Sequence, residues 1–127
     1  MRSAAGILAG VLLVMGTGAA WAHEEHAAGP TGEQTLTGEV VDVFCYLSHG
    51  KEGLGKDHAG CAKKCIGDGL PVALKVGDQL YLATMASHTP ANKFLGQFAG
   101  KQVTVHGNVM EQDGQHLIAI THIEKPE

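Results

Sequence analysis

The segment from Cys45 to Cys65 contains every cysteine of the chain, together with two histidines. Three thiols and one imidazole form a donor set that holds a single metal ion in tetrahedral geometry in many proteins. Soft thiolate ligands select Cu(I), Zn(II) or iron–sulfur centres. The residue types therefore predict a metal site whose ligands are Cys45, His58, Cys61 and Cys65, whereas His49 lies in a glycine-rich stretch and is expected to face solvent.

Residue spacing predicts that a short helix carries most of these ligands. Asp57 is a suitable N-cap, and glycines follow the expected helix. His58, Cys61 and Cys65 stand at positions i, i+3 and i+7, which share one face of a helix. Cys45 ends the first predicted strand, so we expect it at the mouth of a barrel, where the ligand face of the helix can reach it.

Several chemical interpretations of the three cysteines remain open. Thiolate softness and a location in the cell envelope favour copper, while the count of four ligands suits structural zinc. Exported cysteines commonly form disulfides, so one bridge from Cys45 to Cys61 or Cys65, with one free thiol, fits the odd number. Thiol redox chemistry is a third interpretation, although the C-x-x-x-C spacing differs from the C-x-x-C motif of thioredoxin-like proteins.

The first 22 residues have the features of a signal peptide. Arg2 precedes an apolar run over residues 7–15, and an A-W-A tripeptide ends at Ala22. The apolar run is too short to cross a bilayer core of about 30 Å as a stable helix. We therefore expect cleavage after Ala22, location in the periplasm or outside the cell, and no membrane association of the processed chain.

Residues 23–34 (HEEHAAGPTGEQ) are polar and lack a hydrophobic period, so they are expected to form a flexible N-terminal arm. Cleavage after Ala22 would make His23 the N-terminal residue. Its amine and imidazole nitrogens can chelate Cu(II), with His26 close by. His23 and His26 are therefore a second set of candidate metal ligands.

Charge and composition exclude nucleic acid as a partner. The chain has 9 basic and 13 acidic residues, and the signal peptide contains only one of the basic residues, Arg2. The chain lacks both a cluster of cations that could neutralise phosphates and a set of aromatic residues on which bases could stack. The expected partners are a metal ion and an envelope protein.

The sequence of the processed chain predicts five strands and one or two short helices. One long strand is expected over residues 36–47, two strands over 71–84 with a turn at Gly77-Asp78, and two over 101–124 with a turn at Asp113-Gly114. Residues 90–99 have apolar side chains at helical spacing. This order predicts an all-β fold, namely a small five-stranded barrel like the oligonucleotide/oligosaccharide-binding (OB) barrel. The alternative is another small β-barrel or a split sheet.

Histidines also fall on the last two predicted strands, at positions 106, 116 and 122. His106 and His116 flank the predicted 113–114 turn and could face each other across the hairpin. Residues at alternate positions of a strand share a face, so a surface site with two histidines is conceivable. Solvent-exposed histidines on a strand face are the default interpretation.

Residues 38–121 contain the pattern Gly38-x-Val40-x-Asp42-x-x-Cys45-Tyr46, His58-x-x-Cys61-Ala62-x-x-Cys65-Ile66 and Gly69-x-Pro71-Val72-x-Leu74. On this pattern, the chain resembles a group of small, mostly uncharacterised exported bacterial proteins with an OB-like domain. The segment FLGQFAGKQVTVHGNV also resembles the second half of many bacterial OB domains. The resemblance implies the fold and no particular activity.

The expected organisation is a signal peptide over residues 1–22, a flexible arm over 23–34 and an OB-like domain over 35–127, with a Cys/His-bearing insertion at about 46–70. No catalytic triad, paired carboxylates or phosphate-binding loop stands out, so we expect no enzymatic activity. The predicted function is copper or zinc binding in metal sequestration, delivery or envelope stress. The alternatives are a disulfide-stapled OB module that binds a protein or small ligand, and a thiol redox protein.

Overall fold

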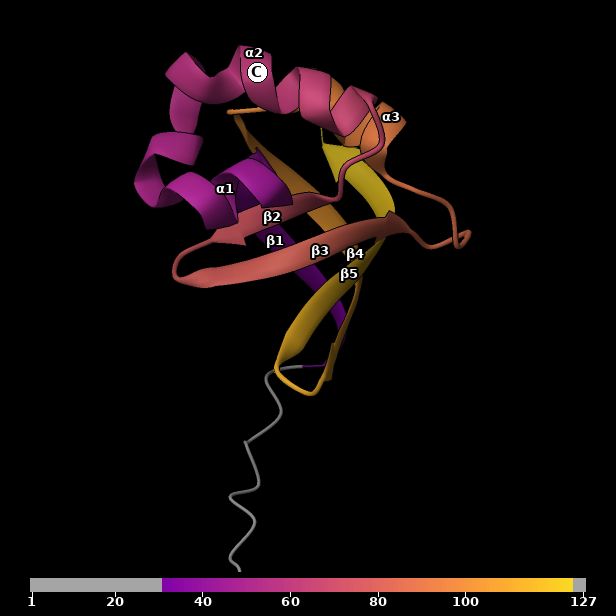
Figure 1. The fold of residues 1–127 in the computed structure, drawn as a ribbon. Coiled ribbons are helices and arrows are strands. Elements are labelled where there is room, and N and C mark those ends of the chain that lie inside the picture. Colours follow the sequence, from indigo (N-terminus) through magenta and orange to yellow (C-terminus); the bar gives the residue numbers. More distant parts are fainter. Residues whose placement is uncertain (1–30, 125–127) are drawn as a thin grey trace, which may run out of the picture.

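The computed structural model describes residues 31–124, which form a closed five-stranded β-barrel with helices across one end (Figure 1). The strand order around the barrel is β1-β2-β3-β5-β4. Neighbouring strands are antiparallel except β3 and β5, which are parallel. The predicted five-stranded barrel is therefore confirmed. Its strands are β1 (Gly32–Asp42), β2 (Val72–Val76), β3 (Gln79–Met85), β4 (Gln102–Gln112) and β5 (Gln115–Glu124).

The predicted fold class was too narrow, because about half of the described chain is in strands and about a third is in helices. The fold is therefore mixed rather than strictly all-β, and it has three short α-helices where one or two were expected. The helices are α1 (Val43–His49), α2 (Gly55–Gly67) and α3 (Asn92–Leu95), with 3₁₀ turns η1 (Gly50–Gly53) and η2 (Gly96–Phe98).

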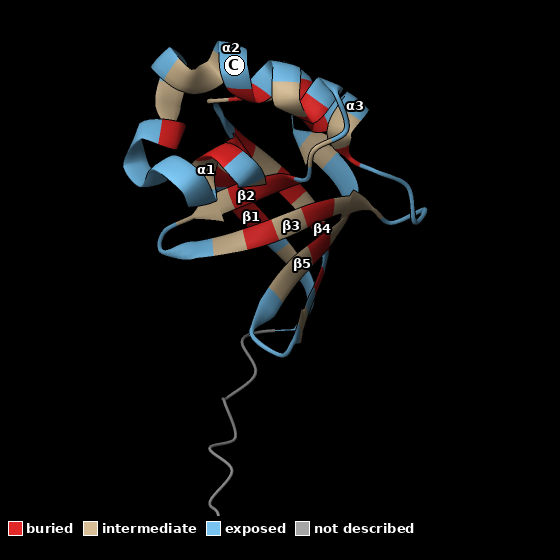
Figure 2. Cartoon of the chain, in the orientation of Figure 1, coloured by how far each residue is buried: buried red, intermediate tan, exposed pale blue. Residues whose placement is uncertain are grey.

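Alternation of side chains along the strands produces the core. In β4 the odd-numbered residues from Val103 to Val109 are buried, and their even-numbered neighbours are exposed or half-buried, as expected for a strand with one face in the core. Figure 2 shows the buried residues concentrated on the inner faces of the strands and on the underside of α2. Ala62 and Ile66 of α2 join this core and so close one end of the barrel.

Both predicted turns are present. Gly77 and Asp78 join β2 to β3, and Asp113 and Gly114 join β4 to β5. Asp113 and Gly114 have φ values of 52° and 74°, the positive values that a two-residue type I′ hairpin turn requires.

The long first strand predicted over residues 36–47 is wrong in its second half. β1 ends at Asp42, and α1 begins at Val43. Cys45 therefore lies on a helix rather than at the end of a strand. At the other end, β1 begins at Gly32, so residues 32–34 of the predicted arm belong to the barrel. The proposed signal peptide and residues 23–30 lie outside the described residues.

Close approach of β4 and β5 requires the absence of a side chain at Gly107. A Cβ atom built at this position would lie 2.3 Å from the carbonyl oxygen of Ala119. The two strands also shift register between His106 and Gly107. A side chain at 107 would push the strands apart at the point where their pairing is already irregular.

We predict that Gly107→Ala lowers the free energy of unfolding by about 1–3 kcal/mol, the usual effect of overpacking. Gly60→Ala is the matched control, because a Cβ atom at Gly60 in α2 meets nothing within 4 Å. Alanine in a helix interior should stabilise by about 0.5–1 kcal/mol. Urea unfolding of both variants in the metal-free, reduced state measures the effects, and equal stability of the two variants would contradict the prediction.

Candidate metal centre

Two helices bring the three cysteines together. Cys45 is the third residue of α1, whereas Cys61 and Cys65 stand one turn apart on α2. The turn η1 connects the helices and packs tightly on α1, since a Cβ atom at Gly53 would lie 2.9 Å from the carbonyl oxygen of Cys45. This close packing folds α2 back over α1 (Figure 1).

The three sulfur atoms form one cluster, with every pair of Sγ atoms within 4.8 Å. The Sγ atoms of Cys45 and Cys61 are 4.0 Å apart. Exposure differs among the three residues: Cys45 is buried, Cys65 is half-buried and Cys61 is exposed. Such a cluster can supply three sulfur ligands to a soft metal ion from one open side.

All three cysteines are free thiols in the structure. A disulfide bond requires about 2.05 Å between sulfurs, roughly half of the observed Cys45–Cys61 separation of 4.0 Å. The sulfurs are therefore spaced as separate ligands around a common point rather than as a bonded pair.

Asp42 positions Cys45 through its side chain. Its carboxylate is fully buried and accepts hydrogen bonds from the backbone amides of Phe44 at 3.3 Å and Cys45 at 2.9 Å. These bonds cap the N-terminus of α1. The sequence prediction missed this role. The spacing could have revealed it, because an N-cap side chain accepts from the amide three residues later, and Cys45 is three residues after Asp42.

The surroundings keep two of the thiols protonated. A hydrogen bond to the Asp42 carboxylate raises the pKa of the Cys45 thiol far above its ordinary value, and burial adds to this effect. Burial also raises the pKa of the Cys65 thiol. A metal ion that binds here must therefore displace the thiol protons.

His58 lies on the predicted helix but is not a member of the sulfur cluster. Its ring nitrogens are not among the ligand atoms that lie within 4.8 Å of one another. Its Nε2 atom is buried and has no hydrogen-bond partner. Among the described residues this is the one buried side-chain nitrogen or oxygen without a partner, which is a costly state for a polar atom.

The remaining predicted details have different outcomes. His23 and His26 lie outside the described residues. The predicted N-cap of α2, Asp57, instead lies in the first turn, and Leu54 occupies the cap position without a side-chain hydrogen bond. The helix itself, with both of its cysteines facing Cys45, is confirmed.

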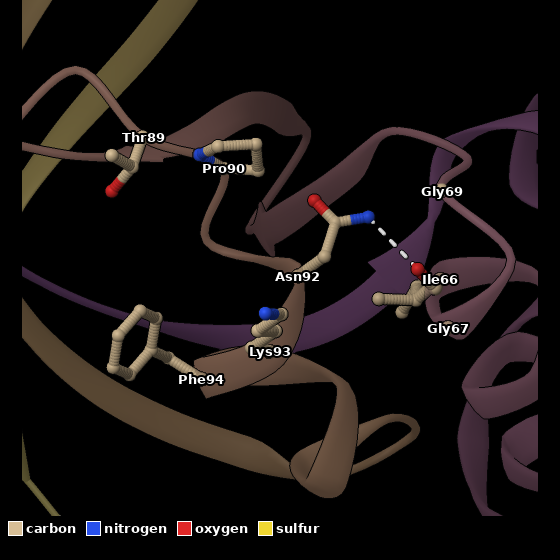
Figure 3. Close-up of a pocket in the computed structure, with 8 residues that line it drawn as sticks. All are labelled: Ile66, Gly67, Gly69, Thr89, Pro90, Asn92, Lys93 and Phe94. Carbon is tan, nitrogen blue, oxygen red and sulfur yellow. Dashed lines mark hydrogen bonds between the residues drawn. The ribbon is translucent and has the colours of Figure 1, made fainter.

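A pocket of about 580 Å³ lies at the C-terminal end of α2 (Figure 3). Asn92 lines this pocket. Its side-chain amide donates hydrogen bonds to the carbonyl oxygens of Ile66 at 2.9 Å and Leu70 at 2.7 Å. These bonds satisfy carbonyl groups at and beyond the C-terminus of α2. Asn92 therefore fixes the helix that carries Cys61 and Cys65.

Comparison of the chain with protein-family models, curated proteins and solved structures finds no match. Within residues 31–124, no helix is both long and apolar enough to cross a membrane.

We predict that Asp42→Ala lowers the free energy of unfolding of the metal-free protein by about 2 kcal/mol, because it removes a helix cap and leaves two amides unpaired. Asp57→Ala, which removes an exposed carboxylate that does not cap α2, should cost less than about 1 kcal/mol. Urea unfolding of the reduced proteins measures both effects. Equal losses in the two variants would show that Asp42 has no special role.

Proposed function

We propose that this protein is an exported metal-binding protein that holds a copper or zinc ion with Cys45, Cys61 and Cys65. The observation that carries the proposal is the meeting of three free sulfurs, contributed by two helices, within 4.8 Å of one another. Thiolates select soft or borderline ions, so copper and zinc fit these donors better than calcium or magnesium.

His58 is proposed as the fourth ligand. Its Nε2 atom is buried without a partner, and the residue lies one turn before Cys61 on α2. Rotation of the side chain towards the cluster would exchange an unsatisfied nitrogen for a metal bond. The two metals differ in their need for this ligand. Zinc sites of this kind are four-coordinate, whereas three thiolates are sufficient for Cu(I).

The proposed role is sequestration or delivery of the ion, or a response to metal stress in the cell envelope. The exposure of Cys61 supports exchange, because an incoming thiolate of an envelope protein can reach this ligand first. Location in the periplasm or outside the cell is proposed from the signal peptide. The strand order and the helix between β3 and β4 support an OB-like classification of the barrel. We propose no catalytic activity.

A disulfide-stapled binding module is the second candidate function. The Cys45–Cys61 separation of 4.0 Å favours it, because a small side-chain movement would bring these two sulfurs into bonding distance. A thiol redox function receives no such support. The raised pKa values of Cys45 and Cys65 reduce the thiolate fraction that attacks disulfides.

We predict that Cys61→Ser and Cys65→Ser each lose the bound ion, because two sulfurs cannot replace a set of three. The melting temperature of the metal-loaded protein should fall to that of the metal-free protein, since binding energy is folding energy at such a site. Elemental analysis, thiol titration after chelation and thermal unfolding measure these effects. Lys63→Ser, an exposed change on the same helix, is the control.

We expect the wild-type protein to bind one ion, and to have three titratable thiols after a chelator has removed that ion. One titratable thiol and no metal would instead support the disulfide-stapled module. Retention of one equivalent of metal by both serine variants would contradict the proposed site.

We predict that His58→Ala weakens the binding of zinc much more than the binding of copper. Loss of the fourth ligand should weaken Zn(II) binding by at least about 10-fold, the smallest effect typical of removing a group that only hydrogen-bonds to a metal ligand, while Cu(I) binding changes little. Competition titrations with a chromophoric chelator for each ion measure both affinities. His49→Ala, which removes an exposed imidazole at the last residue of α1, is the control, and unchanged zinc affinity in His58→Ala would exclude His58 as a ligand.

A further inference from the structure

An irregularity in the pairing of β4 and β5 changes which side chains face outward. His106 pairs with His122, but the next residue, Gly107, pairs with Ile120. Thr121 is therefore an extra residue on β5, and its hydroxyl donates a hydrogen bond of 3.1 Å to the His106 carbonyl oxygen. A bulge of this kind reverses the alternation of side chains beyond it, and such bulges often lie beside functional sites.

The reversal places a histidine and a carboxylate on the outer surface. Before the bulge, the even-numbered residues Ile118 and Ile120 of β5 point into the core and are buried. After it, the odd-numbered Ile123 packs against the core, whereas His122 and Glu124 are exposed. If β5 instead continued past Ile120 without a bulge, with Thr121 in regular pairing, the alternation would turn His122 and Glu124 inward.

These two side chains meet His106 of the neighbouring strand. His106 Nε2 lies 2.7 Å from the Glu124 carboxylate. The rings of His106 and His122 have centroids 5.7 Å apart, with an angle of 38° between their planes. Two imidazoles and one carboxylate therefore converge on the same outer face of β4 and β5.

A third strand orients the His106 ring. His106 Nδ1 lies 2.9 Å from the Thr35 hydroxyl on β1. With Nδ1–H donating to Thr35 Oγ1, the Nε2 atom points towards Glu124. Metal-ligating histidines almost always have such a partner on the second nitrogen, which fixes the tautomer and the ring orientation.

We propose that His106 Nε2, His122 and Glu124 form a second metal site, which binds a borderline divalent ion such as zinc, nickel or Cu(II). Two histidines and one carboxylate on one face form a known ligand set for transition metals. The ion would bind between His106 Nε2 and the Glu124 carboxylate, in place of their hydrogen bond. The exposed His122 completes the set by turning its ring. The hairpin pairing of His106 with His116 that the sequence suggested does not occur, because Glu111 lies opposite His116.

Cadmium-113 NMR tests this site separately from the cysteine cluster, because sulfur ligands move the resonance far downfield of nitrogen and oxygen ligands. The parent protein of this experiment carries the substitutions His23→Asn and His26→Asn, which remove the histidines of the N-terminal segment. We expect one thiolate-type resonance and one nitrogen/oxygen-type resonance. His106→Ala and His122→Ala should each abolish only the second resonance.

Three further variants complete the test. His88→Asn removes an exposed imidazole elsewhere and should leave both signals unchanged; asparagine tolerates the positive φ of 60° at this position. Thr35→Val should weaken cadmium binding at the second site by about 10-fold or more, and Thr35→Ser should restore it. The retained thiolate-type signal shows that each variant is folded.

Two outcomes would overturn the second site: absence of the nitrogen/oxygen-type resonance in the parent protein, or its persistence in both histidine variants. Loss of the thiolate-type resonance alone, with the other still sensitive to His122→Ala, would overturn the cysteine site and support the second one. The two proposals therefore fail independently.

Discussion

One buried carboxylate controls how the barrel joins the metal-binding helices. Asp42 is the last residue of β1, where it pairs with Val72, and it is also the N-cap of α1. Buried amides that leave a strand ladder need new acceptors, and the Asp42 oxygens provide them to Phe44 and Cys45. The direction of α1, and hence the place of Cys45 under α2, depends on this side chain.

The sequence was sufficient for those parts of the fold that depend on local chemistry. Asp113-Gly114 specifies its hairpin turn because both residues tolerate positive φ. Local residue patterns located β2 to β5, and the spacing of Cys61 and Cys65 identified the face of α2 that carries them. In each case the residues that determine the structure are within a few positions of one another.

The parts that could not be predicted depend on partners distant in the sequence. Residues 43–47 (VFCYL) have strong β propensity, yet they form a helix because the buried cap and the packing of η1 override local preference. The bulge at Thr121 arises from the pairing of two strands and leaves no local signal, so the pairing of His106 with His122 was hidden. The environment of His58 was likewise set by the helix packing, and its unpartnered Nε2 became visible only in three dimensions.

Both candidate sites lie where regular strand structure is interrupted, but only the cysteine cluster joins two helices, whereas the second site lies on the paired strands β4 and β5. Cys45 and Cys61 are 16 positions apart, and a cross-link closing a loop of about 15 residues removes about 3 kcal/mol of unfolded-chain entropy. A thiolate-bound metal and a Cys45–Cys61 disulfide would constrain the same loop, but the disulfide consumes two of the three sulfurs. Oxidation of Cys45 and Cys61 and metal binding therefore exclude each other. The packing of α1 against α2 depends on which of the two cross-links forms, whereas the barrel retains its own core in either case.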